Sequence, residues 1–87
     1  MAHIDDIRKL LNTKKLIIGT DRSMKNLKIG KLSKIYVSKN CPNNIKEDIK
    51  YYGGLAGTEV IELEETNEEL GIACKKPFFI SVVSVLK

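Results

Sequence analysis

The sequence is poor in the residues that most small catalytic or metal-binding proteins need. Its 87 residues include no tryptophan, one histidine, two cysteines and two prolines, and only 6% are aromatic. Cys41 and Cys74 have no C-x-x-C partner, so neither a zinc knuckle nor a disulfide framework is indicated, and we expect buried thiols. The one histidine, His3, leaves little material for a metal site or a catalytic triad. We therefore expect no catalytic residues, no metal and no cofactor.

Long hydrophobic runs are also missing. No apolar run approaches the roughly 18 residues of a membrane span, and Asp5 and Asp6 make the beginning of the chain acidic where a signal peptide would be basic. We expect a soluble, cytoplasmic protein without a membrane partner. The length fits one domain, residues 1–87, and the 43% hydrophobic content is ordinary for a chain that folds.

Charge is present in quantity and is unevenly distributed. The net charge is +4. Residues 1–44 contain ten basic and three acidic side chains, a net charge of +7, whereas residues 45–87 contain five basic and eight acidic side chains, a net charge of −3. This asymmetry favours a basic surface that attracts a polyanion such as a nucleic acid. The alternative is that the charged side chains only form a solvated surface and bind no partner.

Hydrophobic periodicity divides the chain into alternating helices and strands. Apolar residues at spacings of three and four predict helices, and short apolar or β-branched runs predict strands. In chain order, the expected elements are a helix over 4–11, a strand over 15–19, a helix over 22–28, a strand over 35–38, a helix over 45–56, a strand over 58–63, a short helix after Thr66 and a strand over 78–86.

Local signals support this order. Thr20 or Asp21 can cap the second helix, and Thr66 with Glu69 forms a capping box for the fourth, which Gly71 or the loop after it ends. The strands over 15–19 and 78–86 are apolar at both odd and even positions, which is typical of strands covered on both faces. We therefore predict an α/β fold, a three-layer α/β/α sandwich with a four-stranded mixed sheet. Loops at the carboxyl ends of its strands should gather at one edge.

Three segments between these elements carry a resemblance to a known family. They are Gly19-Thr20-Asp21-Arg22-Ser23-Met24-Lys25, Lys39-Asn40-Cys41-Pro42 and Lys75-Lys76-Pro77-Phe78. From about residue 16 to 86, the chain resembles the L-thirty-e branch of the ribosomal L-seven-Ae superfamily, whose members bind kink-turn RNA. The similarity includes residues 45–52 and 67–71. The resemblance implies the same sandwich, a kink-turn RNA partner, and a chain that is monomeric outside the ribonucleoprotein. The chain would then be either a protein of the large ribosomal subunit bound to ribosomal RNA or a close paralogue acting on other kink-turns.

The resemblance also implies which residues contact the RNA. They are Gly19, Thr20, Arg22, Ser23, Lys25, Asn26, Lys28, Asn40, Lys75, Lys76, Pro77 and Phe78. Glycine has no Cβ, so RNA can approach the backbone closely at Gly19, and the following helix N-terminus offers N–H groups to phosphate. The alternative for the first segment is a tight turn followed by a solvated helix face.

Two of these residues are open to a second interpretation. The amide of Asn40 can read base edges, but an asparagine before Cys41-Pro42 is also a turn former. Phe78 can stack on an unpaired base, or it can be the first core residue of the last strand, since Phe79 and Ile80 fit a core pattern. Asp21 departs from the family, whose members often carry a basic residue there, and its carboxylate would repel phosphate.

Other functions find weaker support. Neither G-x-x-x-x-G-K-[ST] nor G-x-G-x-x-G occurs at Gly19, and the glutamates 62, 64, 65, 68 and 69 lack a histidine partner, so an enzyme is not indicated. The remaining alternative is an adaptor for other proteins on the same fold, which would bind through an apolar patch rather than a basic edge.

Overall fold

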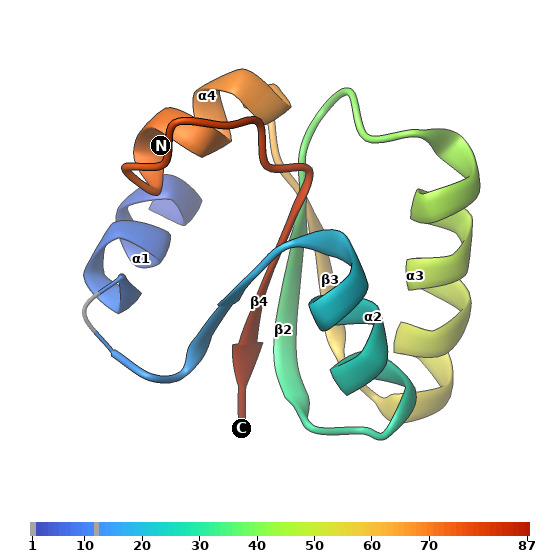
Figure 1. Cartoon of the computed structure of the whole chain (residues 1–87). Helices are drawn as coiled ribbons and strands as arrows, with labels where there is room; N and C mark the ends of the chain where they lie inside the picture. The colour runs from blue at the N-terminus through green and yellow to red at the C-terminus, as the bar shows by residue number, and fades with distance from the viewer. Residues whose placement is uncertain (1, 12) are drawn as a thin grey trace.

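The computed structural model describes residues 2–11 and 13–87, which form four helices and four strands in alternation (Figure 1). The elements are α1 (Ala2–Leu10), β1 (Leu16–Ile18), α2 (Thr20–Lys28), β2 (Leu32–Val37), α3 (Asn43–Ala56), β3 (Glu59–Glu62), α4 (Asn67–Ala73) and β4 (Val82–Leu86). The order of helices and strands is the one that the hydrophobic periodicity predicts.

The strands form one mixed sheet in the order β1-β4-β2-β3. β2 and β3 are parallel, whereas β4 runs antiparallel to both β1 and β2. β4 therefore lies inside the sheet, as its continuous apolar character predicts. β1 is an edge strand that packs on both faces, with Ile17 buried in one core and Leu16 and Ile18 partly buried against the other, so the prediction that it is covered on both faces is confirmed, although burial is complete on one face only.

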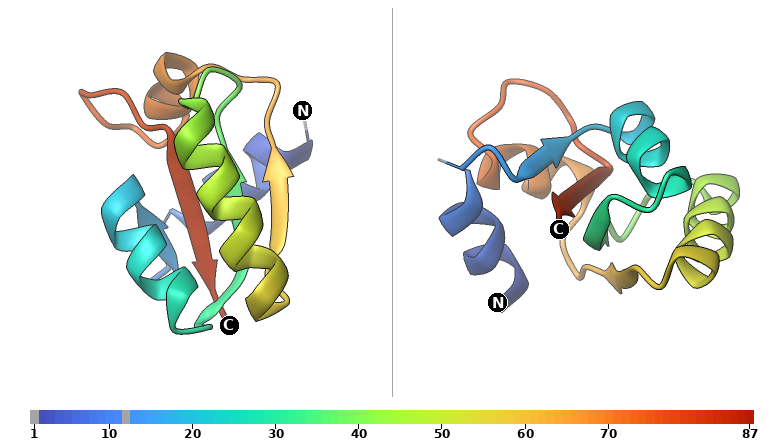
Figure 2. Two further views of the ribbon diagram at one scale, coloured as in Figure 1. Left: turned by 90° about the vertical axis from the view of Figure 1, so that its right-hand side faces the viewer. Right: turned by 90° about the horizontal axis from the view of Figure 1, so that it is seen from below.

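Two helices cover each face of the sheet, which confirms the α/β/α sandwich (Figures 1 and 2). The core on one face joins α1 and α4 to Tyr36, Val83 and Val85. The core on the other face joins α2 and α3 to Ile35, Val37 and Val82. The two buried cysteines are divided between these cores, with Cys74 in the first and Cys41 in the second, and both are free thiols.

The helix starts agree with the sequence in one case and differ in another. Thr66 and Glu69 form the predicted capping box at the start of α4. α2 begins at Thr20, one residue earlier than a Thr20 cap and two residues earlier than an Asp21 cap would allow, because its N-cap residue is Gly19, with φ of 116° and ψ of 150°. Within the described chain, no side chain caps this helix.

The largest error of the sequence-based assignment lies before β4. Residues 78–81 are a loop rather than the start of the strand, and Phe79 is 67% exposed instead of belonging to the core. Ile80 is buried, as its pattern predicts. Pro77 has no backbone N–H to extend a ladder, and the Ile80 N–H donates to the carbonyl oxygen of Asn67, 3.1 Å away, so this segment pairs with α4.

Gly71 lies inside α4 and does not end it. A Cβ at this position would overlap the carbonyl oxygen of Phe78, so the glycine lets the helix and the loop before β4 approach closely. The helix ends at Ala73 and is followed by a Schellman motif, in which the N–H groups of Lys75 and Lys76 donate to the carbonyl oxygens of Ile72 and Gly71. Lys75 takes the left-handed conformation, with φ of 57°.

Candidate nucleic-acid interface

Backbone hydrogen bonds join the three predicted loops along one edge of the sheet. The Gly19 N–H donates to the carbonyl oxygen of Val82 at 3.0 Å, and the Ser38 N–H donates to that of Ser81 at 2.8 Å. Gly19 follows β1, Ser38 follows β2 and Ser81 precedes β4, so the three loops are neighbours (Figure 1). We call the surface made by residues 19–25, 38–42 and 75–81 the rim.

The N-terminus of α2 presents backbone donors at the rim. The first N–H groups of a helix have no intrahelical acceptor, and here no side chain of the described residues caps them. Asp21 lies in the first turn, where its charge suits the helix dipole but opposes an incoming anion. This end of α2 can therefore bind a phosphate or a base-edge acceptor, against the repulsion of one carboxylate.

The predicted contact residues of α2 differ in how far their side chains are free to bind an anion. Arg22 and Lys25 are exposed and free to meet an anion, and Thr20 is half-buried at the first helical position. The Asn26 amide donates to the carbonyl oxygen of Arg22 at 2.9 Å along its own helix. Lys28 lies at the other end of α2, over the ring of Tyr52 in α3, with its ammonium 5.1 Å from the ring centroid. The structure therefore does not bring Lys28 to the rim.

Ser23 is a correction to the predicted site. Its side chain is fully buried, and its hydroxyl lies 2.8 Å from that of Ser84 in the central strand β4. Its backbone N–H donates to the carbonyl oxygen of Gly19. Position 23 falls on the buried face of α2, together with Leu27. Ser23 thus anchors the helix to the sheet and offers no side-chain contact to a ligand.

Asn40 is at the rim and is partly committed to the protein. Its Oδ1 accepts from the backbone N–H of Asn67 at 2.8 Å, and its Nδ2 donates to Oδ1 of Asn67 at 3.0 Å. The side chain of Asn40 remains exposed. The residue therefore holds the loop after β2 against the start of α4.

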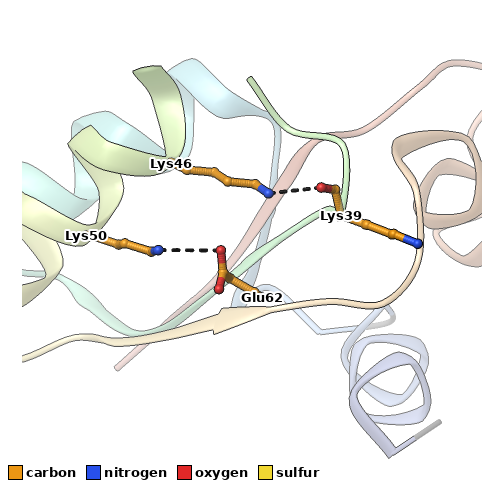
Figure 3. Close-up of polar contacts among 4 residues, drawn as sticks. All are labelled: Lys39, Lys46, Lys50 and Glu62. Atoms are coloured by element: carbon orange, nitrogen blue, oxygen red, sulfur yellow. Dashed lines mark hydrogen bonds and ion pairs between the residues drawn. The ribbon is translucent and has the colours of Figure 1, made fainter. Parts of the chain in front are cut away.

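Lys39 precedes Asn40 and was not among the predicted contacts. Its backbone is fixed on two sides, because its N–H donates to the carbonyl oxygen of Glu65 at 2.7 Å and its own carbonyl oxygen accepts from Lys46 Nζ at 2.9 Å. Figure 3 shows the Lys39 side chain pointing away from Lys46 and α3. The exposed ammonium of Lys39 is thus available at the rim. Its position directly after a strand was the signal that could have identified it.

The loop before β4 carries the apolar part of the rim. Lys75, Lys76, Pro77 and Phe78 are all exposed. Phe78 is 55% exposed, which agrees with a base-stacking role and not with the core alternative. Phe79 and Ile72 are also exposed and were missed, because the apolar pattern placed the first inside the sheet. Together with Glu68, Lys76 and Pro77, these apolar residues line a hollow of about 240 Å³.

The thiols do not add chemistry to this surface. Burial raises the pKa of Cys41, an effect that nearby Lys46 opposes, and burial likewise raises the pKa of Cys74, opposed by Lys76. A raised pKa disfavours the nucleophilic thiolate. Among residues 2–11 and 13–87, no three His, Cys, Asp or Glu side chains are grouped to hold a metal ion. No helix in that same part of the chain is long and apolar enough to cross a membrane.

Fold and rim together define a small α/β/α sandwich whose loops present basic, amide and aromatic side chains at one edge of the sheet. Residues 1–87 match the ribosomal protein L7Ae/L30e/S12e/Gadd45 family, and the chain belongs to this family. This agrees with the family that the three loop segments indicate.

Individual relatives support the same assignment. The chain is 40% identical over 81 residues to large ribosomal subunit protein eL30 of Methanococcus maripaludis, covering 93% of this chain and 76% of the relative. It is 37% identical over 79 residues to eL30 of Methanothermobacter thermautotrophicus, covering 91% and 81%. Among solved structures, the 15.5 kD RNA binding protein of Giardia lamblia has a TM-score of 0.81 at 15% identity, covering 97% of this chain and 70% of that one. A Bacillus halodurans protein of unknown function has a TM-score of 0.86 at 17% identity, covering 97% and 83%.

Proposed function

We propose that this chain is an RNA-binding protein of the large ribosomal subunit, that it acts in the cytoplasm, and that it binds and stabilises kink-turn RNA. The observation that carries the proposal is the joining of the three rim loops by the Gly19–Val82 and Ser38–Ser81 hydrogen bonds. Its relatives at 33–40% identity are named large ribosomal subunit protein eL30. The fold is shared with a protein named for RNA binding.

In this proposal the N-terminus of α2 contacts the RNA backbone at the bend. The N–H groups of Thr20, Asp21 and Arg22 supply donors, and the missing Cβ of Gly19 leaves open space beside them. Arg22 and Lys25, both exposed, supply the positive charge. The recognition is by shape and by contacts to unpaired nucleotides, since duplex RNA has a major groove that is too narrow for side chains.

The loop before β4 receives the unstacked base of the kink-turn. A base that stacks on Phe78 gains about 1–3 kcal/mol, independent of its identity. Phe79, Ile72 and Pro77 extend the apolar surface around that position. Lys75 and Lys76, in the same loop as Phe78, and Lys39, in the loop after β2, supply positive charge for the phosphates on either side of the base. The Asn40 amide contacts a base edge while it stays bonded to Asn67.

The protein binds without catalysing a reaction and needs no cofactor. It is a monomer before it joins the ribonucleoprotein. Asp21 lowers its affinity relative to a family member with a basic residue there, because the carboxylate repels phosphate next to the helix N-terminus.

A salt titration of variants tests this proposal. Arg22→Ala and Lys25→Ala should each lower the affinity for kink-turn RNA and reduce the slope of log K against log salt by about 0.7–0.9. Both side chains are exposed, so the thermal midpoint should stay nearly unchanged. Lys31→Ala, an exposed lysine in the turn before β2, is the matched control and should leave RNA binding unaffected.

The adaptor alternative predicts the opposite salt dependence. The affinity for a partner that binds through an apolar patch should stay the same as salt rises, and it should not change when Arg22 or Lys25 is replaced. RNA affinity that is insensitive to both variants and to salt would contradict the proposed interface.

A further inference from the structure

A hollow lies away from the rim, between α1 and the opposite ends of β2 and β4. It measures about 550 Å³, within the range of about 300–1,000 Å³ that is typical of ligand pockets. Ten residues line it: Asp6, Lys9, Leu10, Lys15, Ser33, Lys34, Tyr36, Val85, Leu86 and Lys87. None of them belongs to the rim.

The charge of this hollow is strongly one-sided. Its lining includes four lysines, Lys9, Lys15, Lys34 and Lys87, against the carboxylate side chain of Asp6. They come from four elements or their ends, because Lys9 is in α1, Lys15 precedes β1, Lys34 is in β2 and Lys87 follows β4. Like charges repel, so four ammonium groups around one hollow are favoured when an anion lies between them.

Two features of the fold create this arrangement. The register of β2 against β4 shifts between Leu32 and Lys34, which leaves Ser33 as an extra residue on β2. Lys34 and Tyr36 are two residues apart on β2 and therefore share the face towards α1, whereas the shift places Leu32 in the core under α2 and α3 and leaves Ser33 at the hollow. The Ser33 hydroxyl donates to the carbonyl oxygen of Val85 at 3.3 Å and holds the bulge in place.

The second feature is the fixed position of the chain after β4. The Leu86 N–H donates to the carbonyl oxygen of Lys15 at 2.8 Å, and the Lys87 N–H donates to that of Lys31 at 3.0 Å. These bonds hold Lys15 and Lys87 at the same end of the sheet. Leu10, Val85 and Leu86 supply an apolar surface among the lysines. A site with this composition suits a ligand that has both anionic groups and flat apolar surfaces.

We propose that this hollow is a second RNA-binding site, which takes the phosphates and one base of a single-stranded segment. The choice of RNA over another polyanion rests on the proposed function, together with the combination of ammonium groups and apolar surface. Lys34 and Ser38 are four residues apart in extended chain, so the hollow and the rim are separated by about 13 Å along β2. Two separate sites allow one protein to hold two segments of a folded RNA.

The test uses the full chain and hexauridylate, an RNA that cannot form a kink-turn. Backbone amide shifts in NMR spectra report each site separately. We expect hexauridylate to shift the amides of Ser33, Lys34, Val85 and Leu86. Four neutralised phosphates predict a slope of log K against log salt of about −2.8 for this site, from −0.7 per charge on a single strand.

Matched double variants isolate the lysines. Lys9→Gln/Lys34→Gln should weaken hexauridylate binding at the hollow about tenfold and bring the salt slope to about −1.4. Lys31→Gln/Lys50→Gln removes the same charge from two exposed lysines outside the hollow and should change the affinity less than twofold. Asp6→Asn removes the opposing carboxylate and should raise the affinity, a gain that a misfolded variant cannot give.

Two further probes separate RNA from other anions. Inorganic phosphate and hexaglutamate should each bind the hollow at least tenfold more weakly than hexauridylate, and equal affinity for either would overturn the RNA assignment. Hexauridylate shifts that are absent, or that are confined to the rim residues 19–25, 38–42 and 75–81, would overturn it as well. Kink-turn binding to the rim is measured in parallel and should be unchanged in Lys9→Gln/Lys34→Gln, so failure of this inference and failure of the proposed function give different results.

Discussion

The side chain of Asn40, at the rim, makes two hydrogen bonds to Asn67, one to its backbone N–H and one to its side chain. Asn40 Oδ1 accepts from the backbone N–H of Asn67 at 2.8 Å, and Asn40 Nδ2 donates to Asn67 Oδ1 at 3.0 Å. Asn67 is the first residue of α4, so its N–H has no acceptor within its own helix. Asn40 thus supplies, from a distant loop, the acceptor for this helix N–H. The loop after β2 is therefore fixed against α4 in the absence of a ligand.

This relationship separates the structural role of Asn40 from its role in binding. Asn40→Ala should lower the free energy of unfolding by about 1 kcal/mol, because the helix N–H loses its acceptor, and should also weaken RNA binding. Asn67→Ala removes only the side-chain acceptor and should cost less stability while RNA affinity is retained. Urea unfolding and gel-shift titration measure the two effects. Equal losses of RNA affinity in both variants would mean that Asn40 acts only by holding the loop.

The contact between Gly71 and the loop before β4 gives a second prediction. In Gly71→Ala the new methyl group meets the backbone of Phe78, so either α4 or the loop must move, at a cost of about 1–3 kcal/mol. Gly54→Ala is the matched control in α3. A Cβ there meets open space, and the variant should gain about 0.5–1 kcal/mol. Thermal unfolding compares the two. A Gly71→Ala protein as stable as the parent would show that the loop is not packed against α4.

The hydroxyl pair of Ser23 and Ser84 predicts non-additive energetics. Ser23→Ala leaves the buried Ser84 hydroxyl without this partner and should cost about 1–3 kcal/mol, and Ser84→Ala should do the same. The double variant removes both polar groups, so its loss should be smaller than the sum of the single losses. Urea unfolding of the four proteins measures the coupling. Additive losses would indicate that the two hydroxyls do not interact.

Stability should fall in alkaline solution. Burial raises the pKa of Cys41 and Cys74 above the ordinary value of 9.0, and burial, then Asp6 and Glu59, raises that of Tyr36 above 10.0. The unfolded chain therefore releases these protons first, and the stabilisation is fully present below pH 9 and is lost as pH rises further. The loss is at most about 1.4 kcal/mol per pH unit for each group. Urea unfolding from pH 7.5 to 10.5 measures it, and Cys74→Ala should flatten the slope. A free energy of unfolding that rises over this interval would contradict the assignment.

Most of the fold follows from local sequence signals. The capping box of Thr66 and Glu69 identifies the start of α4, and the i, i+4 spacing of Ile45 and Ile49 identifies the inward face of α3. These signals act over a few residues and need no tertiary information. The alternation of elements then leaves a helix-covered sheet as the simplest way to bury the apolar strands.

The errors occur where a tertiary contact overrides the local pattern. Phe79 continues an apolar run, yet the bond from Ile80 to Asn67 and the approach of the loop to Gly71 keep it out of the sheet. Ser23 is polar and was assigned to the surface, but a second buried hydroxyl on β4 satisfies it. Neither partner can be identified from the sequence alone, since Ser84 lies 61 residues away.

The candidate site was predictable in outline for a similar reason. Its residues follow or precede strands, and strand ends meet at the edge of a sheet. Lys28 falls outside the rim because it lies at the far end of α2, about two and a half helical turns from Gly19. The basic hollow at the other end of the sheet does not follow from the local sequence pattern, because its four lysines come from separate elements or their ends and only the fold brings them together.

The most direct test of the account compares two RNAs that differ only at the bend. The protein is titrated in gel-shift experiments with a kink-turn RNA and with the same RNA in which the tandem G·A pairs are changed to Watson–Crick pairs. The account predicts much tighter binding to the kink-turn, with Phe78→Ala removing about 1–3 kcal/mol of that binding. Equal affinity for the two RNAs would mean that the rim attracts RNA by charge alone, and would contradict the proposed function.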